Sequence, residues 1–290
     1  MTKAVSFVVA FTLLTLLSGV SFAQAPARCP EAPTYGNDAS AGHTATVNGI
    51  ALYYEVHGEG APLLMIHGNG GSVNSVRCQI AYFSKYRRVI VADSRSHGRS
   101  ENGKGRLTFE QIADDLAALL LSLKIEKSDV WGHSDGGIVA LLLAIRHPRQ
   151  VSKMVASSAN LRPDETALTP AFLKSVREGS QEAAAKIKNG DQSQDWFRRK
   201  RQLDLMLEEP HIPIGDLQKI STPTLVVGAD RDIMPLAHTL EIAANIPGAQ
   251  LFIMPGATHG MLSTEHEFYN MVVARFLDPQ MPQQSPSRLR

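Results

Sequence analysis

The sequence has little cysteine and no excess of charge of either sign. Its two cysteines, Cys29 and Cys78, stand among 290 residues, and neither lies in a context typical of a catalytic thiol. No His/Glu or Cys/His spacing indicates a metal site. Lysine and arginine number 29 against 28 aspartate and glutamate residues, so no surplus of charge favours nucleic acid or an acidic membrane as partner. A small molecule is therefore the expected partner.

The two ends of the chain differ in composition from its middle. Lys3 precedes an uncharged apolar run at 4–20, and small residues follow, which is the pattern of a secretory signal peptide over 1–23. A retained membrane anchor is the alternative, although the run is short for a span. Cleavage would leave a secreted or periplasmic protein without stable membrane association. An arm is expected at 24–42, and the residues at 278–290, rich in Pro, Gln and Ser, predict a disordered tail.

Export would also bear on the two cysteines. Thiols tend to pair in an oxidising compartment, so a disulfide between Cys29 and Cys78 would tie the arm to the core. Free thiols are the other alternative, because the geometry that pairing needs cannot be read from a sequence. Both alternatives stay open at this point.

The middle of the chain alternates between apolar strands and helices. Asn48-Gly49 lies between two segments of alternating polarity, which predicts a hairpin. Strands that are apolar throughout are expected at 62–67, 88–93, 130–131, 151–157, 223–227 and 250–254, separated by helical patterns. Because such strands are buried on both faces, the pattern predicts an α/β protein with a mostly parallel sheet of eight strands and helices on both faces.

The alternation stops between 160 and 221. Helical stretches are expected there at 170–178 and 181–188, followed by the basic run Arg198–Arg201, which we interpret as a solvated helix face. The segment predicts a small helical cap inserted into the core. It would divide the core into two parts, 43–159 and 222–277.

One stretch carries the strongest chemical signal. Gly132, Ser134 and Gly136 form the motif G-x-S-x-G between a buried strand and an apolar helix. Glycines allow a sharp turn there, which exposes the serine hydroxyl at the carboxyl end of the sheet. The N–H of Asp135 would then point at the attacked carbonyl, and the positive end of the helix dipole would lie beneath the developing oxyanion.

A serine nucleophile needs a base, and the base needs a carboxylate that orients it. Asp230 and Asp232 follow a late strand, and His259 follows the last strand. Carboxyl ends of parallel strands converge, so Ser134, one of these aspartates and His259 are expected to meet. We predict Asp232 as the acid, with Asp230 as the alternative; the other histidines near the motif, His67 and His133, are expected to hold loops.

These segments resemble the α/β-hydrolase family, in its group of esterases, lactonases and cofactor-free haloperoxidase-like enzymes. The resemblance extends from about 44 to 276. It is carried by the segments His67–Gly71, Asp93–Ser100, Gly132–Gly137, Pro223–Pro235 and Gly256–His259. It implies an oxyanion hole made by the backbone N–H groups of Asn69 and Asp135, no cofactor, and the second aspartate of the late pair, Asp232, as the acid.

The substrate site is predicted less directly. The Asp135 carboxylate either recognises an amino-bearing substrate or points away and bonds to neighbouring backbone. The cap is expected to cover the pocket, with Phe172 and Trp196 as substrate contacts. Further apolar candidates are Leu161, Phe197, Leu205 and Met206.

The sequence thus predicts a serine hydrolase that cleaves an ester or lactone of a small molecule through an acyl-enzyme. Amide or peptide hydrolysis and perhydrolysis are alternatives with the same residues, because fold and triad do not choose the substrate. A ligand-sensing binding protein of the same fold is the alternative outside enzymes. A pure binder has no need of a complete set of catalytic residues.

Overall fold

The computed structural model describes residue 29 and residues 35–37 and 40–278. The strands are β1 (Gly42–Val47), β2 (Ile50–His57), β3 (Pro62–Ile66), β4 (Arg88–Ala92), β5 (Ser128–His133), β6 (Val151–Ser157), β7 (Thr224–Arg231) and β8 (Gln250–Thr258). The helices are α1 (Arg77–Phe83), α2 (Phe109–Ser122), α3 (Asp135–Arg146), α4 (Pro170–Lys188), α5 (Trp196–Glu208), α6 (Ile214–Leu217), α7 (Leu236–Asn245), α8 (Met261–Thr264) and α9 (His266–Leu277), with short 3-10 turns at Val73–Val76 and Pro148–Gln150. Within these ranges, no helix is both long and apolar enough to cross a bilayer.

The eight strands form one sheet in the order β1-β2-β4-β3-β5-β6-β7-β8. The two pairs that involve β2 are antiparallel and the other five are parallel, so the predicted mostly parallel sheet is confirmed. The hairpin between β1 and β2 turns through Asn48 and Gly49, which have φ values of 44° and 76°. Asparagine and glycine are the residues that adopt this left-handed region most readily.

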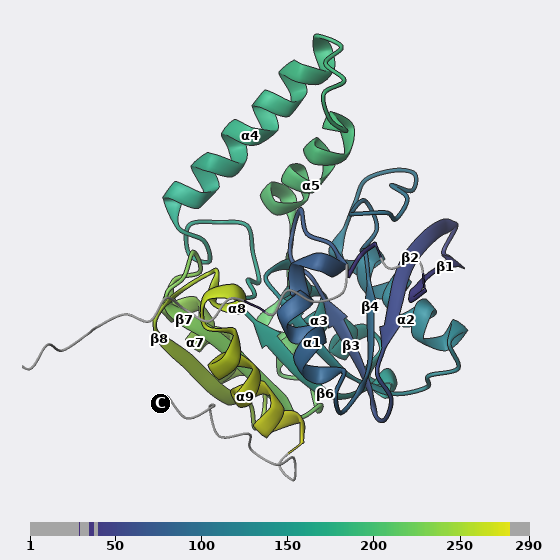
Figure 1. Cartoon of the computed structure of the whole chain (residues 1–290). Coiled ribbons are helices and arrows are strands. Elements are labelled where there is room, and N and C mark those ends of the chain that lie inside the picture. Colours follow the sequence, from purple (N-terminus) through teal and green to yellow (C-terminus); the bar gives the residue numbers. More distant parts are fainter. Residues whose placement is uncertain (1–28, 30–34, 38–39, 279–290) are drawn as a thin grey trace, which may run out of the picture.

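Helices cover both faces of the sheet (Figure 1). Successive strand residues point to opposite faces, so Leu64 and Ile66 pack with α2, α3, α6 and α7, whereas Leu63 and Met65 pack with α1, α8 and α9. Burying each such side chain contributes about 1.5 to 3 kcal/mol. The two apolar layers fix the sheet and thereby the positions of the loops at its carboxyl end.

The cap consists of α4 and α5, which follow β6 in the chain and project from the end of the sheet as a pair (Figure 1). The two expected helical stretches at 170–178 and 181–188 form one continuous helix, α4, so the predicted break was wrong. Gly179 and Ser180 lie where α4 contacts α5. The Ser180 hydroxyl donates to Asp204 Oδ1 at 2.6 Å, and a Cβ added to Gly179 would lie 3.4 Å from Leu203.

The basic run of α5 is not a solvated face, so that interpretation was wrong for two of its arginines. Arg201 donates from Nη1 to Gly105 O at 2.7 Å and from Nη2 to Asn102 O at 3.0 Å. Arg198 likewise donates to backbone carbonyls of the loop after β4. Gln202 Nε2 adds a bond of 2.7 Å to Ser96 O. These three side chains clamp the cap onto the core loop 94–105.

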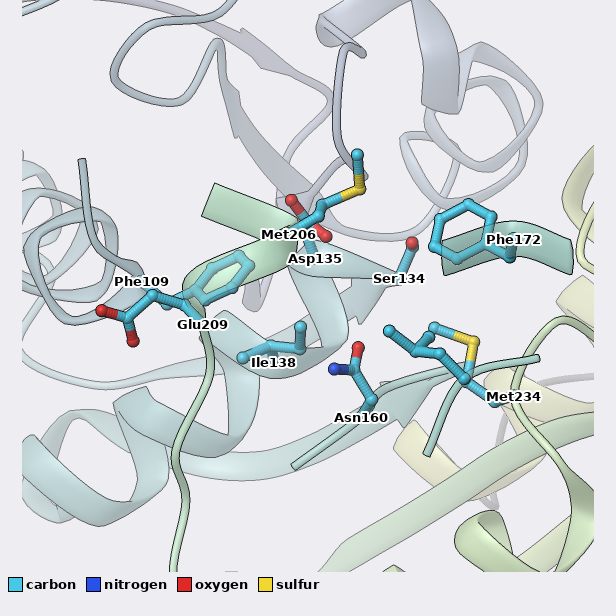
Figure 2. Close-up of a pocket in the computed structure, with 10 residues that line it drawn as sticks. Phe109, Ser134, Asp135, Ile138, Asn160, Phe172, Met206, Glu209 and Met234 are labelled. Carbon is cyan, nitrogen blue, oxygen red and sulfur yellow. The ribbon is translucent and has the colours of Figure 1, made fainter. Parts of the chain in front are cut away.

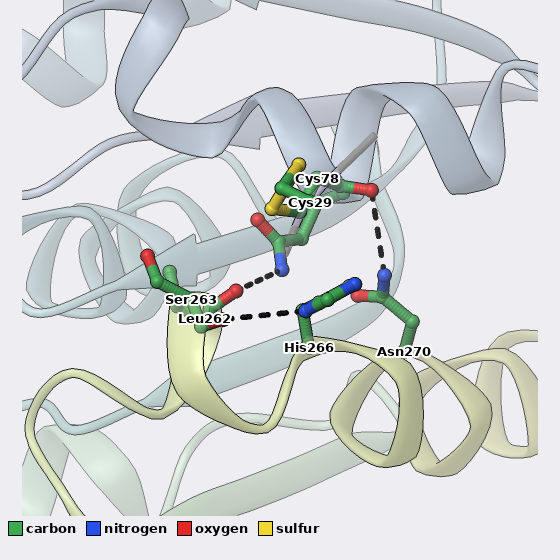
Figure 3. The surroundings of a disulfide bond; sticks show 7 residues. Cys29, Cys78, Leu262, Ser263, His266 and Asn270 are labelled. Atoms are coloured by element: carbon green, nitrogen blue, oxygen red, sulfur yellow. Dashed lines mark hydrogen bonds between the residues drawn. A yellow bond between two sulfur atoms is a disulfide. The ribbon is translucent and has the colours of Figure 1, made fainter. Parts of the chain in front are cut away.

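A disulfide joins Cys29 to Cys78 of α1 (Figure 3), which answers the question that the sequence left open. Asn270 Nδ2 of α9 donates to Cys78 O at 3.4 Å, and Gln79 Nε2 donates to Leu262 O of α8 at 3.0 Å. Cys29 is thus attached to the layer of α1, α8 and α9. The predicted signal peptide at 1–23, most of the arm at 24–42 and the tail after 278 lie outside the described residues.

Candidate active site

Ser134 lies in a sharp turn between β5 and α3. Its φ of 58° and ψ of −124° are unusual for a residue with a side chain, and such strain is stored at functional sites. The turn needs glycine on both sides, because a Cβ on Gly132 would overlap the carbonyl of Gly136, and a Cβ on Gly136 would overlap that of Ile66. The Ser134 N–H donates to Ser157 O at 2.8 Å, which attaches the turn to β6.

The structure brings Ser134, His259 and Asp232 together in one hydrogen-bonded chain. His259 Nε2 lies 3.0 Å from Ser134 Oγ, and its Nδ1 lies 2.7 Å from Asp232 Oδ1. Of the two candidate acids, Asp232 therefore contacts the histidine, whereas Asp230 is exposed to solvent on β7. The chain has the order and the distances that a serine nucleophile, its base and an orienting acid require.

Asp232 is held in place from several sides. Its Oδ2 accepts from the Ser158 hydroxyl at 2.5 Å, and its Oδ1 also accepts from the Ile233 N–H at 2.7 Å. Burial alone would raise the pKa of this carboxyl. The bonds from His259 and Ser158, together with the attraction of His259, outweigh burial and hold the pKa of Asp232 below its usual value. The carboxylate is therefore ionised and available to His259.

Two neighbouring histidines hold loops, as predicted. His133 Nε2 lies 3.1 Å from His259 O. Burial, with repulsion from His259 second, lowers the pKa of His133 to about 3. His67 Nδ1 lies 2.8 Å from Gly68 O, and its Nε2 accepts from the Ser94 N–H at 3.0 Å. Burial also lowers the pKa of His67. Both imidazoles are neutral and connect neighbouring loops by hydrogen bonds.

The Asn69 and Asp135 backbones flank the serine. Asp135 is the first residue of α3, where helix geometry leaves the N–H groups without intrahelical partners. Gly68, directly before Asn69, is so close to the serine that a Cβ added to it would lie 3.0 Å from Ser134 Cβ. Asn69 Nδ2 donates to Asp135 Oδ2 at 2.8 Å and to Gln202 O of the cap at 2.9 Å. One side chain therefore connects both loops to α5.

The Asp135 carboxylate follows neither alternative in full. It is bonded, but to the side chain of Asn69 and not to backbone. Asp135 is also among the residues that line the pocket beside Ser134. Burial raises its pKa to about 6, although the Asn69 amide and the nearby His259 act in the opposite direction. Above that pH the carboxylate is a buried negative charge one residue after Ser134 in the chain.

A narrow pocket opens beside Ser134 (Figure 2). Its free space is about 10 Å³, room for about one water molecule. Phe172 of α4 and Met206 of α5 reach it from the cap, and the remaining lining is half apolar and half polar. Besides these two and Ser134, the lining residues are Phe109, Asp135, Ile138, Asn160, Leu168, Glu209 and Met234.

The predicted substrate contacts are brought together only in part. Phe172 and Met206 line the pocket, as expected. Trp196 does not; its ring packs under Lys186 Nζ of α4 at 5.6 Å. Phe197 is 67 % exposed, and Leu161 and Leu205 are buried in the main core. Trp196, Phe197 and Leu205 lie on faces of α5 that do not turn toward the serine, and Leu161, which follows β6, packs into the core.

Sequence reasoning missed Ser158, Asn160 and Glu209. Ser158 and Asn160 follow β6, which is the neighbour of β5 in the sheet. Because the carboxyl ends of parallel strands converge, their positions in the sequence could have indicated that they lie near Ser134. Glu209 follows α5 and pairs with Arg106 at 3.0 Å, a contact that only the docking of the cap creates. In the described part of the chain, no cluster of His, Cys, Asp and Glu is arranged to hold a metal ion.

Comparisons with known proteins agree with this geometry. A family model described as alpha/beta hydrolase fold matches residues 61–209. The human protein named Serine hydrolase BPHL is 29 % identical over 265 residues, which cover 86 % of this chain and 90 % of the relative. An enol-lactonase from Burkholderia xenovorans has a TM-score of 0.66 at 22 % identity, covering 81 % of this chain and 99 % of that one. A thermophilic esterase from Thermogutta terrifontis has a TM-score of 0.66 at 24 % identity, with coverages of 82 % and 98 %.

Proposed function

The chain belongs to the α/β-hydrolase fold family, and we propose that it is a serine hydrolase that cleaves an ester or lactone of a small molecule through an acyl-enzyme. The observation that carries the proposal is the hydrogen-bonded chain from Ser134 through His259 to Asp232, which ends at a pocket. The names of the human relative and of the two structural neighbours, a serine hydrolase, an enol-lactonase and an esterase, are of the same chemical kind.

The proposed reaction has two halves. Ser134 Oγ attacks the carbonyl carbon while His259 Nε2 takes the hydroxyl proton, and the ionised Asp232 stabilises the imidazolium that forms. The N–H groups of Asn69 and Asp135 stabilise the oxyanion. His259 then gives its proton to the leaving oxygen. In the second half water attacks the acyl carbon while His259 takes a proton from it. The bond from that carbon to Ser134 Oγ then breaks, His259 returns the proton to Oγ, and the acid product leaves.

The pocket lining restricts the substrate. The free space beside Ser134 is small and mostly apolar, so the proposed acyl group is compact and must displace Phe172 or Met206 as it enters. Asp135 favours, as a second candidate, an ester that carries an amino group. Asp135 is among the residues that line this space, and its carboxylate is negative above a pH of about 6.

Turnover of a panel of p-nitrophenyl esters, a lactone and an aminoacyl ester tests the proposal. We expect hydrolysis by the native protein and its loss in Ser134→Ala. We expect Asp135→Asn to weaken aminoacyl-ester turnover selectively, and the native preference for that ester to decrease as the pH falls through about 6, because the carboxylate becomes neutral. Hydrolysis that persists in Ser134→Ala would exclude the serine mechanism; equal losses on neutral esters in Asp135→Asn would exclude amine recognition.

A further inference from the structure

A buried chain of polar side chains leads from the core to the backbone of His259. Trp131 Nε1 of β5 donates to the Tyr269 hydroxyl of α9 at 2.9 Å. The Ser157 side chain, at the end of β6, is near enough to Tyr269 to act against the rise that burial causes in the pKa of its phenol. Ser157 Oγ lies 3.1 Å from His133 Nδ1, and His133 Nε2 lies 3.1 Å from His259 O. The first four side chains are at most 7 % exposed.

The two ends of this chain determine the direction of the bonds at Trp131 and at His133. An indole N–H only donates, and a backbone carbonyl only accepts. At one end the Tyr269 hydroxyl accepts from Trp131. At the other end the His259 carbonyl can only accept from His133 Nε2, so Nδ1 of the neutral ring accepts from the Ser157 hydroxyl. His133 is therefore the tautomer that carries its proton on Nε2, and this N–H donates to His259 O. Any reversal would leave a buried group without its partner, which costs about 1 to 3 kcal/mol.

The chain fixes the residue that the proposed mechanism uses as base. His259 follows β8 in a loop, and its imidazole has to stay within reach of Asp232 and Ser134 at once. The bond from His133 holds the carbonyl of His259, and the two rings lie 4.8 Å apart with an interplanar angle of 36°. Ser157 also accepts the Ser134 N–H with its own carbonyl at 2.8 Å. One pair of residues, His133 and Ser157, thus holds the backbones of both reacting residues.

The same bonds keep His133 neutral beside a histidine that becomes charged. The Ser157 O–H occupies the lone pair of His133 Nδ1, which is the position where a second proton would have to bind. A positive His133 at this distance would oppose the imidazolium of His259. A neutral ring that donates to the His259 carbonyl does not.

We propose that His133, held as its Nε2–H tautomer by Ser157, Tyr269 and Trp131, is a positioning residue for His259. This inference rests on the proposed function, because it assigns His259 the role of base. The structural part of it, the tautomer, is measurable without any turnover.

The test combines spectroscopy with kinetics. Nitrogen-15 NMR of the full native protein is expected to show a neutral His133 protonated on Nε2. In His133→Leu we expect kcat on the best p-nitrophenyl ester to fall about 10- to 100-fold with KM within about twofold, since a small misplacement of a catalytic group costs rate more than binding. His133→Gln places an amide N–H near the same carbonyl and is expected to recover most of the rate.

Smaller changes along the chain give a graded series. Ser157→Ala and then Tyr269→Phe are expected to reduce kcat by progressively less, and Tyr82→Phe, which removes a hydroxyl outside the chain, is expected to leave it unchanged. A proton on Nδ1 of His133 would overturn the inference, as would equal kinetics of the Leu and Gln variants. If the Leu variant does not fold, the tautomer and the Gln variant still decide. Absence of turnover in the native protein, by contrast, would contradict the proposed function and leave the tautomer measurement valid.

Discussion

At the scale of single residues, hydrogen bonds hold the side chains of the site in place. Asp232 accepts three hydrogen bonds at 2.7 Å or less, from His259, Ser158 and the Ile233 N–H. Asp230, two residues earlier, is exposed. The sequence could place the acid within this pair, because both aspartates follow the same strand. Only the geometry of the loop after β7 separates them.

Exchanging each aspartate for asparagine tests this assignment. In Asp232→Asn the amide cannot accept and stabilise the charged imidazole as a carboxylate does, and we expect kcat to fall roughly 1,000- to 10,000-fold. Asp230→Asn is the matched control and is expected to retain native kinetics. Steady-state ester hydrolysis measures both variants. A large loss in Asp230→Asn with a mild one in Asp232→Asn would contradict the assignment.

At the scale of elements, the sequence predicted the strands and helices of the core well and the cap less well. Core strands are apolar throughout, so they can be recognised in the sequence without any knowledge of the fold. In the cap, Gly179 and Ser180 suggested a break, but they are small because α5 packs closely against α4 at that point. Arg198 and Arg201 bind backbone carbonyls, which every residue carries, so no sequence pattern indicated their partners.

The clamp of the cap gives a prediction about access to the pocket. Arg201→Ala removes the bonds to Gly105 O and Asn102 O, and we expect it to lower the free energy of unfolding by about 1 to 3 kcal/mol. A looser cap lets Phe172 and Met206 move apart, so preference should shift toward esters with longer acyl chains.

Denaturant unfolding and a chain-length series of p-nitrophenyl esters measure the two effects. Arg177→Ala, which removes an exposed arginine of α4, is the control and is expected to change neither. An unaltered chain-length preference in Arg201→Ala would show that the clamp does not govern access.

At the scale of the whole molecule, a parallel sheet explains why residues far apart in the chain form one site. Ser134, Asp232 and His259 follow β5, β7 and β8, and all three strands end at the same edge of the sheet. The sequence therefore sufficed to predict the fold and the meeting of these three side chains, whose catalytic roles stay a proposal. It could not predict all of the remaining pocket lining, since Phe109 and Glu209 line the pocket only through the packing of α2 and the cap on the core.

Labelling with a fluorophosphonate tests the central claim, a nucleophilic Ser134, most directly. The reagent forms a stable bond to an activated serine oxygen with loss of fluoride. Mass spectrometry of the digested protein is expected to place one label on the peptide that contains Ser134. The label should be absent in Ser134→Ala and form far more slowly in His259→Ala, because the hydroxyl then lacks its base. A label on another residue, or no label on a protein that hydrolyses esters, would contradict the account.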